Sequence, residues 1–332
     1  MILTNERHTN DCIVVAGMHR SGTSALTAAL QSLGAYLGNP LLPPTQTNPR
    51  GYFEHSKVVK SHKALLTKLS RTWSDLRPLP ADWERSRATT TCQRALANLL
   101  RRDFSENILW AVKDPRICRV LPMWLPILKQ LNVTPRFIIP LRHPGEIADS
   151  LRRRDNFSSP KSGMLWMIHS LEAERATRGF RRCFVMWDRL LDAPDQTLNQ
   201  VGTTLQLEWP RFQSMQTLRS VLDSSLRHAD QSNHDFNQFG LAQRPVESLW
   251  NIFNTEDLDS ANTAIRFDQL YSEYLNAFTG PDSVESGPIV QSGTPELSQW
   301  IQNEHSEVPL RHPGRSWPVR VLQRLGRTTH VH

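Results

Sequence analysis

A glycine-rich segment near the N-terminus carries residue types that bind anions. It runs from Gly17 to Ser24, between an apolar stretch over 12–17 and a helical pattern over 25–33. A strand, a glycine-rich turn and a helix in this order form a unit whose backbone N–H groups and helix N-terminus hold phosphate oxygens. The residues that we expect to line such an anion site are Gly17, His19, Arg20, Ser21, Gly22, Thr23 and Ser24.

This loop differs at one position from the loops that bind nucleoside triphosphates. Those loops carry a lysine before the final Ser or Thr, and it reaches the β- and γ-phosphates. Thr23 stands at that position here, and Arg20 supplies one fixed positive charge. The set suits a shorter anion with two centres, such as a 5′-phosphosulfate, better than a triphosphate. The alternative is an ordinary strand-to-helix turn without a ligand.

The elements around the loop predict an α/β protein. Further apolar runs indicate strands at 108–112, 137–141 and 183–187. Helical patterns lie at 56–70, 90–104, 146–154 and 163–178, and the stretch 190–275 is mainly helical. This alternation predicts a P-loop-like three-layer fold, with a mostly parallel central sheet flanked by helices. Because ligands bind beyond the carboxyl ends of such strands, we expect the 17–24 loop, Lys113 and Arg142 to meet at one edge.

Composition narrows the classes of function. The 332 residues include 32 arginines and seven lysines, and the formal net charge is +7. Acidic and basic residues alternate over most of the chain and no aromatic–basic RNA motif is present, so we expect no nucleic-acid partner. The four cysteines form no Cys-x-x-Cys pair, which argues against a metal site and favours a reducing cytoplasm. No apolar run reaches the roughly 20 residues that span a bilayer.

The segment from Ala16 to Ala25 resembles the 5′-phosphosulfate loop of sulfotransferases. That family takes its sulfuryl group from 3′-phosphoadenosine 5′-phosphosulfate (PAPS). A strand that ends at Arg142, with Ser150 eight residues later, is similar to the family's second element. The resemblance implies that Arg142 and Ser150 bind the 3′-phosphate of PAPS. Two helical turns would return the serine to the side of the arginine.

Other segments resemble the bacterial branch of the family that includes carbohydrate and tyrosylprotein enzymes. Gly51-Tyr-Phe-Glu54 and Lys113-Asp-Pro match stretches of that branch. Met186 to Pro194 is similar to its Tyr-Glu-Asp-Leu segment, although Trp187 and Asp188 depart from the usual pair. A weaker match lies at 223–228, and the resemblance covers about 12–230.

Sulfuryl transfer to a hydroxyl needs a general base and cations around the leaving phosphate. The resemblance implies Glu54 as the base, with His55 as the runner-up because the cytosolic branch uses histidine. The alternative role of Glu54 is structural: an acidic residue in the first turn of a helix interacts favourably with the helix dipole. Lys113 is the expected electrostatic stabiliser. We expect a glycan hydroxyl as acceptor, while a protein tyrosine, a small metabolite and, in a different class, a P-loop nucleotide kinase remain open.

The C-terminal part of the chain differs in composition from the rest. We expect a sulfotransferase domain over 1–278, followed by a linker and basic tail over 279–332 that has five arginines and no acid after Glu307. We expect a cytoplasmic protein. The tail could dock on an anionic membrane surface, or it could form a frayed or packed terminus.

Overall fold

The computed structural model describes residues 10–46, 48–211, 215–222 and 235–278. The expected linker and basic tail, and the weak family match at 223–228, lie outside these residues. In the described part of the chain, no helix is both long and apolar enough to cross a membrane.

A four-stranded parallel sheet lies at the centre of the molecule. Its strands are β1 (Asn10–Val15), β2 (Leu109–Lys113), β3 (Val133–Leu141) and β4 (Arg182–Met186), in the order β2-β1-β3-β4. Every residue of β2 is buried, and so are the last four of β1, which explains their continuous apolar sequence. All three pairings are parallel, so the four carboxyl ends lie along one edge.

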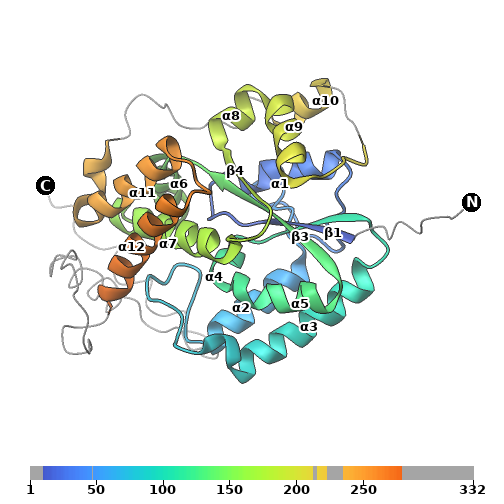
Figure 1. Cartoon of the computed structure of the whole chain (residues 1–332), viewed down its shortest axis with the longest axis horizontal. Helices are drawn as coiled ribbons and strands as arrows, with labels where there is room; N and C mark the ends of the chain where they lie inside the picture. The colour runs from blue at the N-terminus through green and yellow to red at the C-terminus, as the bar shows by residue number, and fades with distance from the viewer. Residues whose placement is uncertain (1–9, 47, 212–214, 223–234, 279–332) are drawn as a thin grey trace, which may run out of the picture.

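Helices cover both faces of the sheet (Figure 1). One face carries α1 (Thr23–Ser32), α8 (Trp187–Asp192), α9 (Pro194–Leu205) and α10 (Met215–Val221). The other carries α2 (Ser56–Lys68), α3 (Arg87–Asp103), α4 (Ile117–Val120) and α5 (Trp124–Gln130). The remaining helices pack beside β3 and β4: α6 (Pro144–Asp155), α7 (Ser159–Thr177), α11 (Gln243–Thr255) and α12 (Ala261–Asn276). The predicted three-layer α/β fold is confirmed.

Most elements begin within a few residues of their predicted positions. The differences are largest at β3, at α7, which begins at Ser159 and not at the predicted 163, and at α4 and α5. Strand β3 starts at Val133, four residues before the predicted 137, because Pro135 and Arg136 interrupt the apolar run there. Helices α4 and α5 were not predicted, since Pro122 and Pro126 break the segment and α4 is buried on every side, which leaves no amphipathic period.

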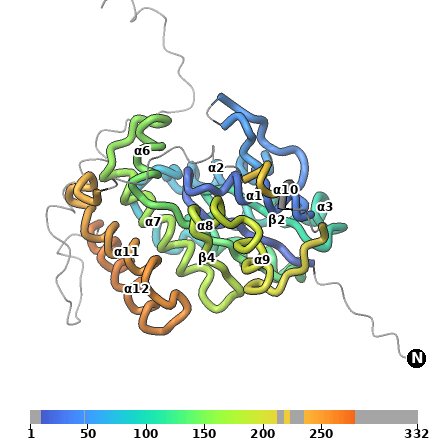
Figure 2. Tube along the Cα trace, turned by 90° about the horizontal axis from the view of Figure 1, so that it is seen from above, coloured from blue at the N-terminus to red at the C-terminus, as the bar shows by residue number. Residues whose placement is uncertain are grey.

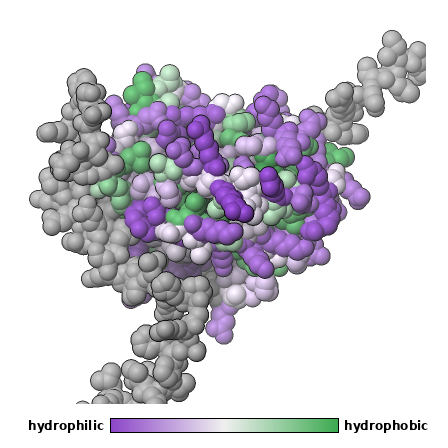
Figure 3. Space-filling model, turned by 90° about the horizontal axis from the view of Figure 1, so that it is seen from below, coloured by the Kyte–Doolittle hydropathy of each residue, from purple (hydrophilic) through white to green (hydrophobic). Residues whose placement is uncertain are grey.

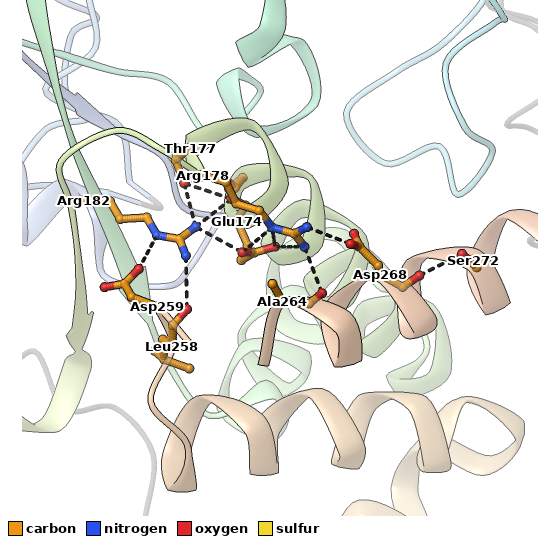
Figure 4. Close-up of polar contacts among 10 residues, drawn as sticks. Glu174, Thr177, Arg178, Arg182, Leu258, Asp259, Ala264, Asp268 and Ser272 are labelled. Atoms are coloured by element: carbon orange, nitrogen blue, oxygen red, sulfur yellow. Dashed lines mark hydrogen bonds and ion pairs between the residues drawn. The ribbon is translucent and has the colours of Figure 1, made fainter. Parts of the chain in front are cut away.

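A buried ion network attaches the C-terminal helices to the sheet (Figure 4). Glu174 of α7 is fully buried, and its carboxylate accepts hydrogen bonds from Arg178 at 2.7 Å and Arg182 at 3.1 Å. Arg182 also donates to Asp259 at 2.9 Å, and Arg178 donates to Asp268 of α12 at 2.9 Å. Glu174 of α7 therefore bonds directly to Arg182 of β4, and it is linked to α12 through Arg178, which bonds to Asp268.

The outer surface offers few apolar areas. The face seen in Figure 3 is mainly hydrophilic, with small and separate hydrophobic areas. The large hydrophobic residues exposed among the described ones are Ile108, Phe180, Leu241 and Ile265, each on a different element or loop. Single exposed apolar side chains are normal on a folded protein.

The Glu174 network yields a stability prediction. Glu174→Gln leaves two arginines short of a buried counter-charge, so the free energy of unfolding should fall by about 3 kcal/mol. Asp268 is a half-exposed partner of Arg178, so Asp268→Asn should lower the free energy of unfolding by less than about 1 kcal/mol. Urea unfolding of both variants measures the difference, and equal losses would show that Glu174 is not the centre of the network.

Candidate active site

The loop between β1 and α1 has the backbone conformation of an anion site. Arg20 and Gly22 have φ of 72° and 83°, and α1 begins at Thr23 without a side-chain cap. No side chain therefore caps the first N–H groups of α1. A helix N-terminus that binds an anion leaves these N–H groups available to the ligand. A non-glycine residue at positive φ, such as Arg20, is uncommon and is concentrated at functional sites.

Two glycines of this loop sit where no side chain fits. A Cβ on Gly17 would lie 2.4 Å from Cγ of Pro140, and a Cβ on Gly22 would lie 2.2 Å from the ring of Trp187. Ser21 is buried beneath the loop, where its hydroxyl donates to the carbonyl oxygen of Met18 at 2.6 Å. Gly17 and Ser21 thus shape the loop from below rather than facing a ligand.

The strand ends meet around one cavity of about 570 Å³. Figure 2 shows that α6 and the chain following α1 stand at the same end of the molecule, beside this edge. The predicted site residues that line the cavity are His19, Arg20, Gly22, Thr23, Ser24, Glu54, Lys113 and Arg142. Trp187 and Arg154 line it as well. The expected convergence of the loop, Lys113 and Arg142 is therefore observed.

Lys113 and Glu54 form a buried ion pair at the cavity wall. The Lys113 ammonium donates to Glu54 Oε1 at 2.7 Å, to the carbonyl oxygen of Tyr52 at 2.9 Å and to Ser24 Oγ at 3.1 Å. Both side chains are at most 5% exposed. Burial raises the pKa of Glu54, and the charge of Lys113 opposes that rise. The carboxylate is thus a stronger proton acceptor than an exposed glutamate.

Arg20, Arg142 and Ser150 lie together, but not in the expected pairing. Arg20 Nε donates to Ser150 Oγ at 2.6 Å, and Arg142 Nη1 donates to the carbonyl oxygen of Arg20 at 3.2 Å. Arg142 Nε also donates to the buried carboxylate of Glu146 at 2.5 Å. Arg20 therefore stands between the two residues that the family resemblance joins, and Glu146 is a partner that the sequence analysis missed.

Arg20 lies among other cations. Burial lowers the pKa of Arg20, and the charges of Arg154, Arg142 and Arg153 lower it further. Within the described residues no carboxylate lies within ion-pair distance of Arg20. An anion in the cavity would relieve this repulsion.

His55 is placed away from the cavity and is not among its lining residues. Its Nε2 lies 3.0 Å from the carbonyl oxygen of Asn39 and 3.6 Å from the carboxylate of Asp103, and its ring packs against Phe104. Burial lowers the pKa of His55. The backbone turns it to the opposite side from Glu54, so its position gives it no access to a substrate in the cavity.

Asp114 fixes the end of β2. It is fully buried, and its carboxylate bonds to Nδ1 of His62 at 2.8 Å and Nη1 of Arg116 at 2.7 Å. The indole of Trp124 donates to the other nitrogen of His62 at 2.9 Å. Although burial favours the neutral acid, these partners hold the pKa of Asp114 well below its usual value. Asp114 thus holds the backbone that presents Lys113.

Trp187 lines the cavity although its sequence predicted no role, and Arg154 belongs to the run 152–154, whose sequence fits either a contact to a nucleotide or anionic acceptor or a solvated helix end. The Trp187 ring lies against Gly22, and the Arg142 guanidinium sits 5.3 Å from its centroid. Arg154 lies 5.4 Å from the ring centroid of Trp73 and lines the cavity, whereas its neighbour Arg152 is exposed and paired with Asp149. The position of Trp187 directly after β4 is the sequence feature that could have indicated a site residue. Nothing in the sequence distinguishes Arg154, which lines the cavity, from Arg152, which does not. In the described part of the chain, no cluster of three His, Cys, Asp or Glu residues could hold a metal ion.

Comparison with known proteins finds similar solved structures at low identity. No family model matches the chain, and no curated protein matches it. The sulfotransferase domain of the Synechococcus PCC 7002 olefin synthase is 14% identical over 91% of this chain and 98% of its own, with a TM-score of 0.38. Sulfotransferase STF1 of Mycobacterium tuberculosis H37Rv is 13% identical over 72% of this chain and 76% of its own, with a TM-score of 0.40. Mouse sulfotransferase SULT7A1, complexed with PAP, is 12% identical over 91% of this chain and 90% of its own, with a TM-score of 0.35. Likenesses this distant do not assign a function, which has to rest on the residues of the site.

The crowding of Gly22 can be tested against a matched glycine. Gly22→Ala adds both the left-handed strain of about 1–2 kcal/mol and a collision with Trp187. Gly179→Ala adds the same strain at φ 78° but meets no atom within 4 Å. We expect Gly22→Ala to lower the melting temperature more than Gly179→Ala and to weaken anion binding at the loop. Equal melting temperatures would show that Trp187 moves aside freely.

Proposed function

We propose that this protein is a PAPS-dependent sulfotransferase that moves a sulfuryl group to an acceptor hydroxyl, on a glycan. The observation that carries the proposal is the meeting of an uncapped helix N-terminus, several cations and a buried carboxylate around one cavity. The cations are Arg20, Arg50, Lys113, Arg142 and Arg154, and the carboxylate is Glu54.

The donor side of the site matches a molecule with two separate anionic groups. The α1 N-terminus and Arg20 suit the 5′-phosphosulfate, because helix N–H groups and a guanidinium both bind phosphate oxygens. Arg142 and Ser150 suit the 3′-phosphate, and Arg20 links the two sites through its contact with Ser150. Thr23 has no charge, so a third phosphate would lack the lysine that P-loop kinases supply.

The acceptor side needs a base, and Glu54 suits that role. The acceptor oxygen forms a bond to sulfur while the bond from sulfur to the phosphate oxygen breaks. The acceptor proton passes to the Glu54 carboxylate, and 3′-phosphoadenosine 5′-phosphate (PAP) leaves with the electron pair of the broken bond. Lys113 keeps Glu54 ionised before the transfer, since an opposite charge at 2.7 Å favours the carboxylate.

Ligand-induced thermal shifts test the donor. PAP at about 100 times its dissociation constant should stabilise the native state by about 2.7 kcal/mol, which raises the melting temperature. Arg142→Gln should lose most of this shift because the charge-assisted bonds to phosphate disappear. The exposed Arg152→Gln is the matched control and should keep it. A shift with ATP and none with PAP would favour the nucleotide kinase instead.

Removing the base should abolish turnover without removing the donor. Glu54→Gln should lower the rate of sulfuryl transfer from labelled PAPS by about 10²–10⁴-fold, as expected for a positioned general base. The PAP-induced thermal shift should persist, and the exposed Glu106→Gln should retain full activity. Unchanged turnover in Glu54→Gln would remove Glu54 as the base.

The pH dependence follows from the environment of Glu54. A base works only when deprotonated, so the rate should fall as the pH drops through the folded-state pKa of Glu54. Burial raises that pKa, so the midpoint should lie above the value of about 4.3 for a free glutamate. Lys113→Met should move the midpoint further upward, because it removes the charge that opposes the rise. A midpoint at or below the free value would contradict the buried position of the carboxyl group.

A further inference from the structure

Arg154 is a cation of the cavity wall to which the donor site and the proposed base give no role. It belongs to the last turn of α6 and lines the cavity. Its side chain is 21% exposed, so a ligand in the cavity can reach it. Oδ2 of Asp155 accepts a hydrogen bond from Nε of Arg154 at 2.8 Å and lies 2.7 Å from Nη2. The other guanidinium nitrogen, Nη1, makes no hydrogen bond to the described residues.

Aromatic rings hold Arg154 in place beside the anion loop. The guanidinium carbon lies 5.4 Å from the ring centroid of Trp73, and that ring packs against His19 at 4.2 Å and Phe157 at 5.7 Å. A second cation, Nζ of Lys161, lies 4.7 Å from the Phe157 ring. A guanidinium stacked on an aromatic face is attracted to it and keeps one orientation. Arg154 is thus oriented before any ligand arrives, which lowers the entropy lost on binding.

Arg154 lies one helical turn beyond the serine of the proposed donor site. Ser150 and Arg154 are four residues apart on α6, so they lie on the same face of the helix, about 6 Å apart along its axis. Ser150 stands at the level of the anion loop, because its hydroxyl accepts the hydrogen bond from Arg20 at 2.6 Å. Since α6 begins just after Arg142 at the end of β3, Arg154 lies further from the sheet than the anion loop does.

Arg142 and Arg154 also turn towards different sides of the cavity. The Arg142 guanidinium lies against Trp187, which begins α8 on one face of the sheet. The Arg154 guanidinium lies against Trp73, in the connection between α2 and α3, and these helices cover the other face. Glu54 lies in the segment that leads into α2. A donor bound to Arg142 therefore leaves the guanidinium of Arg154 available to a second ligand.

Resting on the proposed function, we propose that Arg154 binds a carboxylate of the acceptor, so that the acceptor is an anionic saccharide that contains a uronic acid. A guanidinium binds a carboxylate through charge-assisted hydrogen bonds, which are about twice as strong as neutral ones. The 3′-phosphate of PAPS offers oxygens of the same kind, so the experiment has to separate these two sources. Arg154 is then a residue that determines acceptor specificity, and Trp73 and Asp155 position it.

The test compares saccharides that differ only in a carboxylate. Methyl glycosides of glucuronic and galacturonic acid are matched with those of glucose and galactose, and each is titrated by NMR into the protein saturated with PAP. Binding is measured directly, so the result does not depend on which hydroxyl reacts. The variants are Arg154→Gln and Arg154→Lys, with the exposed Arg152→Gln as the matched control. Melting temperatures with and without PAP accompany each variant.

The unaltered protein should bind at least one uronide about 10- to 100-fold more tightly than its neutral match, as expected for hydrogen bonds between charged groups. Arg154→Gln should remove this preference and keep most of the PAP-induced thermal shift. Arg154→Lys should retain part of the preference, because an ammonium keeps the charge without the planar fork. Arg152→Gln should retain all of it. With labelled PAPS, the preference should appear in the KM of an accepted uronide rather than in kcat.

Three results would overturn the inference. Uronides that bind no more tightly than their neutral matches would exclude the carboxylate. A loss of the PAP shift in Arg154→Gln as large as that in Arg142→Gln would assign Arg154 to the 3′-phosphate of the donor. An equal loss of preference in Arg152→Gln would indicate a general effect of surface charge. Each of these results would reject the inference alone, whereas the absence of any PAP shift in the unaltered protein would reject the proposed function itself.

Discussion

The ammonium group of Lys113 holds the candidate site together. Its three hydrogen bonds reach the first turn of α1, the carbonyl oxygen of Tyr52 and the carboxylate of Glu54. Tyr52 and Glu54 belong to one segment, so Lys113 joins the end of β2 to two segments that are separate in sequence, the start of α1 and the residues before α2. A nearly fully buried lysine is tolerable only when its charge is paired and its donors are used. The position of the base relative to the anion loop therefore depends on a cation at the end of β2.

The arginines of the described chain divide into two kinds by their partners. Arg182, Arg119 and Arg116 are buried, and each has a carboxylate within ion-pair distance, so an opposite charge lies beside each of them. At the cavity the balance differs, because Arg20 lies near Arg142 and Arg154 without a carboxylate of its own among the described residues. Arg20 therefore offers a small anion in the cavity a guanidinium that no described carboxylate contacts. A basic composition need not indicate nucleic acid.

Local patterns in the sequence predicted most of the elements, although not α4 and α5, and the edge of the sheet where the candidate site lies. The apolar runs of β1 and β2 are continuous because both strands are covered on both faces, and Gly22 marks a turn that only glycine can make next to Trp187. Such patterns did not predict which side chains complete the candidate site. Whether Glu54 or His55 faces the cavity depends on the backbone direction entering α2. The insertion of Arg20 between Arg142 and Ser150 depends on three separate segments meeting in space.

The same geometry separates the two tasks of the site. The residues proposed to hold the donor follow strands of the sheet: Arg142 directly follows β3, and the anion loop follows β1. Glu54, by contrast, lies in the segment that connects α1 on one face of the sheet with α2 on the other. Under the proposed function, the donor site is formed at the edge of the parallel sheet, next to the core. The proposed base lies in a connection, and connections tolerate sequence change better than core strands, so we expect acceptor specificity to vary more readily than donor binding.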